Sequence, residues 1–170
     1  ELSSASFEYI GDELDLFRHA RRWKAYWSSR IRPFIGGDVL EVGAGLGANT
    51  KYLQNPGVRS WHWLEPDPKL AGQLREATSG LDRCTITTGT IESVVGCRYD
   101  CILYIDVLEH IEDDRGELAR AASLLRPEGC LIVLAPAHQF LYSPFDRSIG
   151  HYSRYDRRSL EACSPKECAL

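Results

Sequence analysis

A glycine-rich loop between a short apolar run and a helical segment constrains this chain more than any other feature. Residues 39–42 are typical of a buried strand, and Gly43, Gly45 and Gly47 follow them directly. Glycine has no Cβ, so such a loop turns tightly and lets a ligand approach the backbone, with the first N–H groups of the next helix facing the same crevice. A tight turn without a ligand is the alternative. In this strand–loop–helix context the pattern favours a ligand-binding crevice.

Short apolar runs alternate with helical stretches along the rest of the chain. We expect strands at residues 39–42, 61–64, 85–87, 101–105 and 131–135. We expect helices at residues 48–54, 69–78, 115–125 and 156–163. Pro127 and Gly129 are expected to end the helix at 115–125 before its strand. Because parallel strands need crossover connections, the alternation predicts an α/β fold with a doubly wound, mostly parallel sheet.

An amphipathic N-terminal helix precedes this core. Its apolar residues recur at steps of three or four on one helical face, namely Leu16, Ala20, Trp23, Trp27 and Ile31. The same segment carries a basic cluster, namely Arg18, His19, Arg21, Arg22 and Lys24, with Arg30 and Arg32 nearby. Such a cluster is either a solvated helix face or a patch for an anionic substrate, such as a phosphorylated metabolite, an anionic lipid or an RNA end.

Composition excludes several classes of protein. With 44% hydrophobic and 26% charged residues, the chain matches an ordinary globular domain, which excludes a disordered chain and a fibrous repeat protein. Its net charge of −4 gives no bulk attraction to nucleic acid, which would need a local patch such as the aromatic and basic residues 152–158. The longest apolar run, residues 130–135, is too short to span a bilayer, and the N-terminus has no signal-like core. We therefore expect a cytoplasmic protein without a transmembrane segment.

The sulfur-containing residues add two expectations. The six cysteines form no CxxC pair, and Cys84, Cys101 and Cys130 lie in or beside apolar runs. We expect them to be reduced core thiols, not a disulfide framework or a zinc site. The chain has no methionine, not even an initiator, which indicates a processed product or a fragment.

Glu65 is the acidic partner of the glycine loop. It ends the second apolar run, 22 positions after Gly43. At the crevice of an α/β sheet a carboxylate can accept both hydroxyl hydrogens of a ribose. The sequence therefore predicts an adenosine-containing cofactor, and the glycine pattern leaves a nicotinamide dinucleotide open as well.

Four segments in order resemble the motifs of class I S-adenosylmethionine-dependent methyltransferases. These segments are residues 39–47, with Glu41 two places before the first glycine, and residues 64–68, 104–111 and 125–131. The resemblance implies a Rossmann-like sheet with strand order 3-2-1-4-5, in which the last two strands of the family's seven-stranded sheet are absent. It implies one domain, residues 1–170, with a helical cap at 1–35 and a cofactor-binding core at 36–170 that we expect to be incomplete at its C-terminus. Strand five would then be an exposed edge that a second copy could cover in a homodimer.

The resemblance also implies the cofactor site. Gly43, Gly45 and Gly47 would line the methionine and ribose parts of S-adenosylmethionine, and Glu65 would bind the ribose hydroxyls. Where family members often carry an acidic residue for the adenine, this chain has Thr90, which would accept a hydrogen bond, and Ile91, which would pack on the ring. Glu41 and Asp106 complete the expected cofactor-binding residues. Tyr26 and Trp27 of the leading helix would close over the cofactor.

The chemistry of methyl transfer needs a base if the acceptor is a hydroxyl. His151, His110 and His138 are the candidate catalytic residues, because all follow the fourth and fifth strands. The segment from Asp106 to His110 also resembles the divalent-metal site of two subgroups, which 2′-O-methylate small-RNA 3′ ends or act in the ubiquinone pathway. Both usually carry glutamate where this chain has Asp106.

That resemblance implies a metal site for Mg²⁺ or Mn²⁺. Its ligands would be Asp106, Glu109, His110 and His151. The alternative is that Glu109 and His110 merely start a helix and face solvent.

The sequence thus predicts a methyltransferase that uses S-adenosylmethionine and acts on an unidentified small or anionic acceptor. A non-catalytic subunit or scaffold with the same fold is the second hypothesis, and an NAD-dependent oxidoreductase is the third. The pattern does not separate O-, N- and C-methylation, because these differ in the acceptor pocket and not in the cofactor loop.

Overall fold

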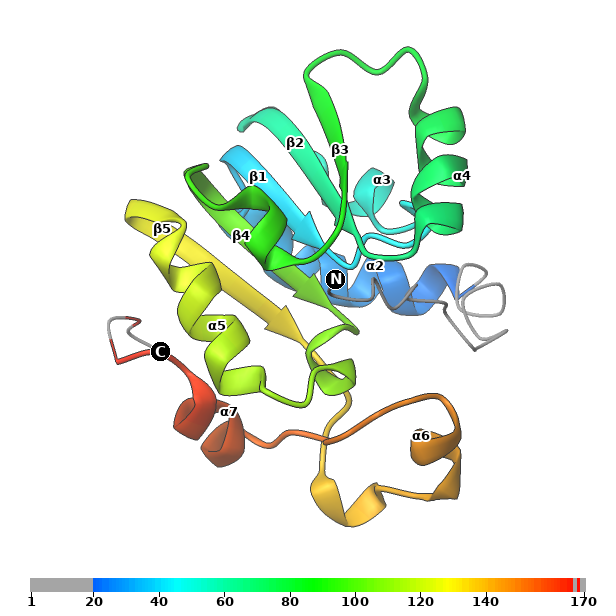
Figure 1. Ribbon diagram of the computed structural model, residues 1–170, viewed down its shortest axis with the longest axis vertical. Coiled ribbons are helices and arrows are strands. Elements are labelled where there is room, and N and C mark those ends of the chain that lie inside the picture. Colours follow the sequence, from blue (N-terminus) through cyan, green and yellow to red (C-terminus); the bar gives the residue numbers. More distant parts are fainter. Residues whose placement is uncertain (1–19, 167, 169–170) are drawn as a thin grey trace, which may run out of the picture.

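A five-stranded parallel sheet forms the centre of the protein (Figure 1). The computed structural model describes residues 20–166 and residue 168. The strands lie in the order β3-β2-β1-β4-β5, and their bounds are β1 Gly37–Val42, β2 Val58–Glu65, β3 Cys84–Thr88, β4 Tyr99–Ile105 and β5 Leu125–Leu134. Every pairing between neighbouring strands is parallel. The predicted doubly wound sheet and its strand order are confirmed.

Helices connect the strands and follow the last one. Their bounds are α2 Arg21–Ile31, α3 Thr50–Leu53, α4 Pro68–Thr78, α5 Asp114–Ser123, α6 Pro144–Ser148 and α7 Arg157–Cys163. Short 3₁₀ turns lie at Arg32–Phe34, Ile91–Val94, Leu108–His110 and Gln139–Leu141. α4 starts where Asp67 accepts hydrogen bonds from the first helical N–H groups and Pro68 occupies the first helical position. The helix expected at 48–54 is shorter, because residues 44–49 form the turns of the glycine loop.

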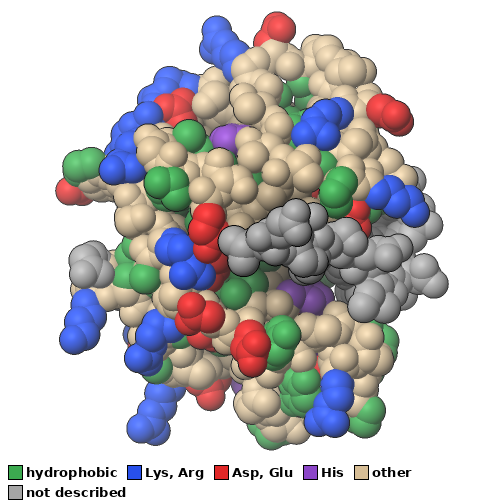
Figure 2. Space-filling view, viewed as in Figure 1, with side chains coloured by type: hydrophobic (Ala, Val, Ile, Leu, Met, Phe, Trp, Pro, Cys, Tyr) green, Lys and Arg blue, Asp and Glu red, His purple; other side chains and the backbone are tan. Residues whose placement is uncertain are grey.

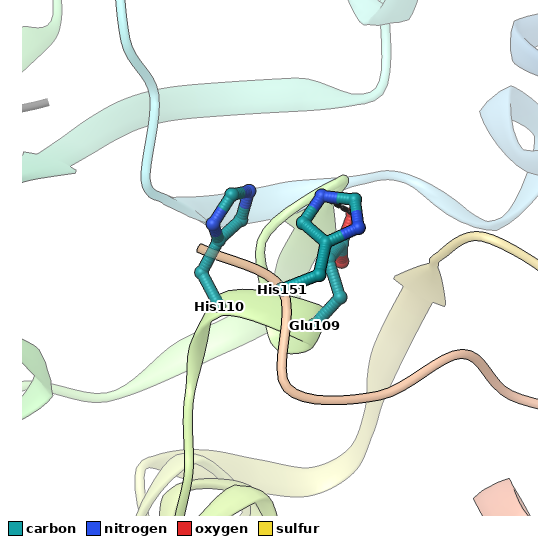
Figure 3. Close-up of side chains that lie close together, drawn as sticks. All are labelled: Glu109, His110 and His151. Atoms are coloured by element: carbon teal, nitrogen blue, oxygen red, sulfur yellow. Dashed lines mark ion pairs between the residues drawn. The ribbon is translucent and has the colours of Figure 1, made fainter. Parts of the chain in front are cut away.

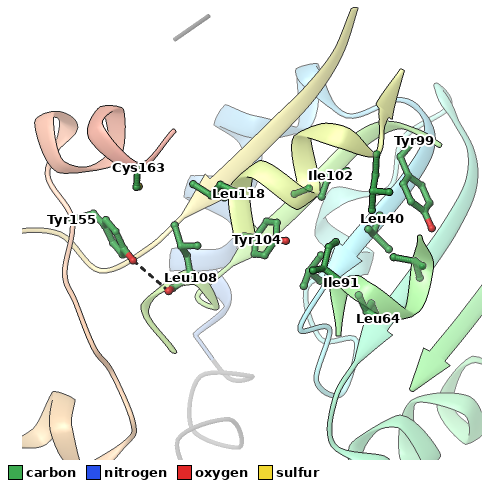
Figure 4. Packing of buried hydrophobic residues seen from close by; sticks show 14 residues of the cluster. Leu40, Leu64, Ile91, Tyr99, Ile102, Tyr104, Leu108, Leu118, Tyr155 and Cys163 are labelled. Carbon is green, nitrogen blue, oxygen red and sulfur yellow. Dashed lines mark hydrogen bonds between the residues drawn. The ribbon is translucent and has the colours of Figure 1, made fainter. Parts of the chain in front are cut away.

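Each face of the sheet has its own hydrophobic core. Side chains alternate along β4, so that Ile102 and Tyr104 lie in one cluster and Cys101 and Leu103 lie in the other. The first cluster includes Leu118 of α5 and Cys163 of α7 (Figure 4). The second includes three side chains from the helices on the opposite face, namely Trp27 of α2, Leu53 of α3 and Leu74 of α4. Helices therefore cover both faces, as the alternation of elements predicts.

The buried face of α2 differs from the predicted stripe. Trp27 is buried as expected, but Trp23 is 51% exposed and stacks near Tyr26, while Lys24 is only 7% exposed. The inward residues are Lys24, Trp27 and Ser28, which are spaced by three and four positions and so share a helical face. Lys24 tolerates burial because its ammonium group donates to Asn49 Oδ1. Leu16, Arg18 and His19 lie outside the described residues.

The entry into β5 also corrects a prediction. α5 ends at Ser123, and Pro127 lies inside β5 instead of ending the helix. Tyr99 pairs with Leu125 while Cys101 pairs with Cys130, so residues 126–129 bulge out of the ladder. A bulge accommodates proline, which has no N–H to donate to a neighbouring strand.

A lobe beyond β5 lies past the carboxyl ends of the strands (Figure 1). We define this C-terminal lobe as residues 136–156, and it contains α6. Tyr155 anchors the lobe: its hydroxyl is within hydrogen-bond distance of Asp114 Oδ2 at 2.9 Å and of Leu108 O at 3.3 Å, and Figure 4 shows the contact with Leu108. An isolated bridge between Ala137 and Tyr155 closes its base. These contacts place the lobe next to the turn that follows β4.

Surface features agree with several expectations from composition. In the view of Figure 2, acidic and basic side chains are interspersed, with Lys and Arg most frequent along the margin near β5 and α7.

None of the helices in the described part of the chain is both long and apolar enough to cross a membrane. All six cysteines are free thiols, and Cys101 is buried while Cys84 and Cys130 are half-buried. β5 is an outer strand of the sheet.

Candidate functional site

The glycine loop is held by its own backbone and by tight packing. Gly43, Gly45 and Gly47 have φ values of 63°, 54° and 69°, a region that glycine adopts most readily. Gly43 N donates to Leu64 O at 2.8 Å, which ties the loop to the end of β2. A Cβ at Gly43 would lie 2.6 Å from Val107 Cγ2. At this position the protein's own packing already requires glycine.

Glu65 joins the end of β2 to the glycine loop. Its Oε2 accepts a hydrogen bond from Gly45 N at 2.7 Å, and its Oε1 accepts one from Asp67 N at 2.9 Å. The residue is only 4% exposed, and burial raises the pKa of its carboxyl group. A carboxylate oxygen has more than one acceptor site, so both oxygens retain acceptor capacity toward a further donor.

Glu41 lies at the end of β1 beneath the loop. Its Oε2 accepts from Thr50 Oγ1 at 3.0 Å and from Trp61 Nε1 at 2.9 Å. Its Oε1 is buried and, within the described residues, lacks a hydrogen-bond partner. Burial raises the pKa of Glu41 to about 7, against the hydrogen bonds from Thr50 and Trp61. The site therefore contains a buried acceptor that the described residues leave unpaired.

Lys24 is a buried candidate site residue, whereas both alternatives in the sequence analysis, a solvated helix face and a surface patch for an anionic substrate, expected it to be exposed. Instead α2 directs it toward the carboxyl ends of β1 and β4, where its ammonium group donates to Asn49 Oδ1. Burial lowers the pKa of Lys24, and the nearby carboxylates of Asp106 and Glu41 oppose that shift. Helical spacing with Trp27 and Ser28 was the signal that could have identified it.

Asp106 occupies the first position after β4 in a strained backbone conformation. Its φ is 54°, which is uncommon for a residue other than glycine, and its N–H donates to Leu134 O at 2.8 Å. The residue is exposed to solvent, and partial desolvation by the surrounding protein raises the pKa of Asp106 to about 6. Lys24 opposes that shift. Asp106 thus faces the region between α2 and the strand ends.

The residues expected at the adenine differ in accessibility. Thr90 is exposed and its hydroxyl donates to Glu92 Oε2 at 2.5 Å. Ile91 is 1% exposed and lies in the core cluster with Leu64. Thr90 can therefore accept a hydrogen bond from a ligand while it donates to Glu92, whereas Ile91 presents almost no surface in this conformation.

Glu109, His110 and His151 converge beside this region (Figure 3). One potential ligand atom from each lies within 4.8 Å of the others. The two imidazole rings meet edge to face, with centroids 4.6 Å apart. Glu109 is only 1% exposed, so the alternative that it faces solvent is wrong. Asp106 and His138 are not members of this cluster, and His138 is exposed in the lobe next to Phe140.

The Glu109 carboxyl group has unusual surroundings. Its Oε1 lies 4.0 Å from His151 Nε2, and its Oε2 is buried without a hydrogen-bond partner in the described part of the chain. Burial raises the pKa of Glu109 to about 8, and the charge of Asp106 adds to the increase. Tyr152 N donates to Glu109 O at 2.7 Å and joins the lobe to the turn that carries Glu109.

Asp146 and Arg154 are further site residues that the sequence analysis missed. Asp146 has no exposed surface, and its Oδ1 accepts from Arg154 Nε at 2.7 Å and lies 3.1 Å from His151 Nδ1. The same carboxylate forms a capping box with Ser143 at the start of α6. A Ser-x-x-Asp pattern before a helix was the available signal, but it indicates a helix start and not a contact with His151.

A cavity at the other end of the sheet is a different feature from the candidate site. A cavity of about 390 Å³ lies between the segment before β2 and the start of β3, and its lining includes Asn55, Arg59 and Arg83. That is the opposite end of the sheet from the glycine loop. In parallel α/β sheets ligands bind beyond the carboxyl ends of the strands, so the clustered polar groups define the candidate site.

Comparison of the sequence with known proteins identifies relatives of this chain. A profile of the methyltransferase domain family matches residues 9–164. The chain is 30% identical over 109 residues to a ubiquinone biosynthesis O-methyltransferase of Azorhizobium caulinodans, covering 61% of this chain and 42% of the relative. It is 27% identical over 142 residues to a demethylmenaquinone methyltransferase of Tropheryma whipplei, covering 82% of this chain and 57% of the relative.

Solved structures agree on the fold. The mitomycin 7-O-methyltransferase superposes with a TM-score of 0.67 at 19% identity, over 88% of this chain and 49% of that one. The chain spans about half the length of the curated relatives that it matches.

Proposed function

The chain belongs to the class I S-adenosylmethionine-dependent methyltransferases, and we propose that it binds this cofactor at the carboxyl ends of β1, β2 and β4 and methylates an acceptor beside His151. One observation carries the proposal. The Glu65 carboxylate is fixed at the end of β2 by Gly45 N and Asp67 N, with both oxygens able to accept further hydrogen bonds. Two ribose hydroxyls are the donors that suit such a group.

Other groups around the loop support this assignment. The unpaired Glu41 Oε1 and the exposed Asp106 are acceptors on the side of the site next to Lys24 of α2. An S-adenosylmethionine molecule carries an ammonium group and hydroxyls that match such acceptors. The residues present therefore fit the cofactor.

Lys24 supplies the opposite charge. Its ammonium group lies beside Asn49 of the glycine loop, and it is the right partner for the carboxylate at the amino-acid end of the cofactor. We propose accordingly that residues 1–170 form one domain in which the leading helix caps the cofactor-binding core. Trp27 takes no part in direct closure over a ligand, because it is packed in the core beneath α2.

The chain's own groups account for the remaining chemistry. When bound, S-adenosylmethionine supplies an electrophilic methyl group on a sulfonium that is already a good leaving group. The protein must align an acceptor with that methyl and remove the acceptor's proton if it is a hydroxyl. His151 is the base that the geometry favours, because Asp146 holds its Nδ1 and leaves Nε2 facing Glu109.

A divalent cation is a second candidate at the same place. Glu109, His110 and His151 would hold Mg²⁺ or Mn²⁺, which would lower the pKa of an acceptor hydroxyl. The unpaired, buried Glu109 Oε2 supports this fit, since a cation would compensate its burial. Asp106 is a cofactor-side residue in this proposal and not a ligand.

The lobe suggests the chemical class of the acceptor. Phe140, Phe145 and Tyr152 are 82%, 59% and 54% exposed, so the lobe that carries His151 presents large apolar side chains at its surface. We propose an apolar small molecule with a hydroxyl group. The O-methyltransferase named among the relatives acts in ubiquinone biosynthesis, which is consistent with such an acceptor.

Calorimetric titration tests the cofactor assignment. The protein is titrated with S-adenosylmethionine and, as a control, with NAD. Saturable binding of S-adenosylmethionine alone supports the proposal, whereas a preference for NAD would indicate an oxidoreductase. Binding without turnover across a panel of phenolic and catecholic acceptors would favour a non-catalytic subunit.

Chelation tests the metal separately. Unchanged turnover after treatment with a chelator and gel filtration would remove the cation from the proposal and leave His151 as the base. Loss of turnover that returns with Mg²⁺ or Mn²⁺ would support the cation.

A further inference from the structure

Asp146 is a fully buried carboxylate, and each of its two oxygens has hydrogen-bond partners within the lobe. Oδ2 accepts from the backbone N–H and the hydroxyl of Ser143, both at 2.9 Å. Oδ1 accepts from Arg154 Nε at 2.7 Å and lies 3.1 Å from His151 Nδ1. The Ser143 backbone N–H and the Arg154 guanidinium can only donate, so each oxygen of Asp146 already acts as an acceptor, as in a carboxylate.

These contacts determine which nitrogen of His151 carries a proton. An ionised carboxylate only accepts hydrogen bonds, so His151 Nδ1 must be the donor in this pair. In the neutral imidazole the other nitrogen, Nε2, is then a free acceptor. Nε2 lies 4.0 Å from Glu109 Oε1, on the side that faces the cluster. A histidine with the opposite tautomer would direct a proton toward the cluster and present no base there.

The backbone reinforces the same orientation. His151 N donates to Asp146 O at 2.9 Å, and the hydroxyl of Tyr142 donates to His151 O at 2.6 Å. The loop around His151 is therefore held at its main chain as well as at its ring. Arg154, with 22% of its side chain exposed, balances the charge of Asp146 from the outer side.

We propose that Asp146 is a positioning residue that keeps the His151 proton on Nδ1 and directs Nε2 toward Glu109. The tautomer follows from the contacts alone. Its importance for catalysis rests on the proposed function, in which His151 acts as a base or as a metal ligand. In both cases Nε2 is the atom that takes the proton or binds the metal. A residue that hydrogen-bonds to Nδ1 sets the tautomer and the orientation of the ring, and so affects the basicity of Nε2.

Nitrogen-15 NMR of the histidine side chains tests the tautomer directly. The chain has five histidines, and a His151→Gln spectrum assigns the signal of His151. Spectra are recorded with chelator present, at a pH where the ring is neutral. We expect the Nδ1–H tautomer in the wild type and a shift toward Nε2–H in Asp146→Asn. A wild-type His151 protonated on Nε2 would overturn the proposal, even if the variant did not fold.

Asp114→Asn is the matched control. Asp114 also anchors the lobe, through the hydroxyl of Tyr155, but its carboxylate accepts from tyrosine and not from histidine. If both variants are equally stable and only Asp146→Asn changes the tautomer, a general loosening of the lobe is excluded. An equal tautomer shift in both variants would contradict a specific role for Asp146.

Kinetics then connect the tautomer to the reaction. We expect Asp146→Asn to lower kcat by about 10- to 100-fold, with the affinity for S-adenosylmethionine unchanged. An unchanged kcat would contradict the positioning role. Because the NMR readout needs neither cofactor nor turnover, failure of S-adenosylmethionine binding would overturn the proposed function without touching the tautomer result.

Discussion

The two halves of the candidate site are built in different ways. The cofactor half, which comprises the glycine loop, Glu41 and Glu65, is held by bonds between adjacent strands and their loops. The acceptor half, which comprises Glu109, His110, His151 and Asp146, depends on contacts between the turn after β4 and the C-terminal lobe. The hydroxyl of Tyr155 joins the lobe to that turn, because it contacts Leu108 O, which is 47 positions away in the sequence.

This difference separates binding from turnover. Backbone N–H groups fix Glu65, so its position follows from the sheet itself. His151 is fixed by a side chain of the same lobe, and the lobe is joined to the rest by a few hydrogen bonds. We therefore expect changes in the lobe to impair turnover while cofactor binding survives, and changes in the cofactor half to impair both.

The largest expected effect is on cofactor affinity. Glu65→Ala removes two hydrogen bonds from ribose hydroxyls to a charged acceptor, worth about 3 kcal/mol together, so the Kd for S-adenosylmethionine should rise about 100-fold. His151→Ala should leave that Kd unchanged while lowering turnover. Calorimetry and a methyl-transfer assay measure the two effects. A large loss of binding in His151→Ala would show that the two halves are not separable.

The junction between the halves gives the next largest effect. Alanine at position 43 would have to adopt the positive φ of Gly43, and its Cβ would press on Val107 after β4. Gly43→Ala should therefore lower the free energy of unfolding by about 2 to 3 kcal/mol. Gly72→Ala is the control, because nothing lies within 4 Å of its added methyl group inside α4. The control should gain about 0.5 to 1 kcal/mol. Denaturant unfolding measures both, and equal losses would contradict the packing argument.

The pH dependence of stability sharpens the description of the cofactor half. Folding raises the pKa of Glu41 from 4.5 to about 7, so the folded state holds its proton longer than the unfolded state. The contribution of Glu41 is fully present below pH 4.5 and is lost as the pH rises through 7. Between pH 5 and pH 8 this loss is about 2.5 kcal/mol.

Glu41→Gln should remove that part of the slope. Unfolding free energies at the two pH values measure it, with the exposed Glu76→Gln as the control. A wild-type slope that survives in Glu41→Gln would mean that another group is responsible.

The smallest expected effect is the contribution of Lys24, in α2, to the affinity for S-adenosylmethionine. Lys24→Met keeps the length of a buried side chain but removes its charge, and it should weaken S-adenosylmethionine binding by about 10-fold. Binding of 5′-methylthioadenosine, which lacks the amino-acid carboxylate, should change much less. Equal losses for both ligands would indicate that Lys24 supports the fold of α2 and not the carboxylate of the cofactor.

The same contrast explains what the sequence could predict. The glycine loop and the position of Glu65 follow from local patterns, because strand ends and their loops determine them. The strand order is a matter of pairing between distant segments, and the resemblance to a known family implied it. The burial of Lys24 was missed because its compensation comes from Asn49 on another element. Asp146 was missed because its contact with His151 depends on the path of the lobe, which no periodicity encodes.

The entry into β5 shows a third kind of failure. Pro127 is normally a sign that a helix has ended or a strand is interrupted. Here a bulge opposite β4 accommodates it, and the strand begins two residues earlier, at Leu125. The pairing of β5 with β4 therefore sets where the strand begins, which the proline alone does not indicate.

A crystal structure of the protein with S-adenosylhomocysteine tests the central claim most directly. The account predicts both ribose hydroxyls within about 3 Å of the two carboxylate oxygens of Glu65, and the amino-acid carboxylate of the ligand at Lys24. A ligand bound elsewhere, with Glu65 making only its contacts to Gly45 and Asp67, would contradict the account.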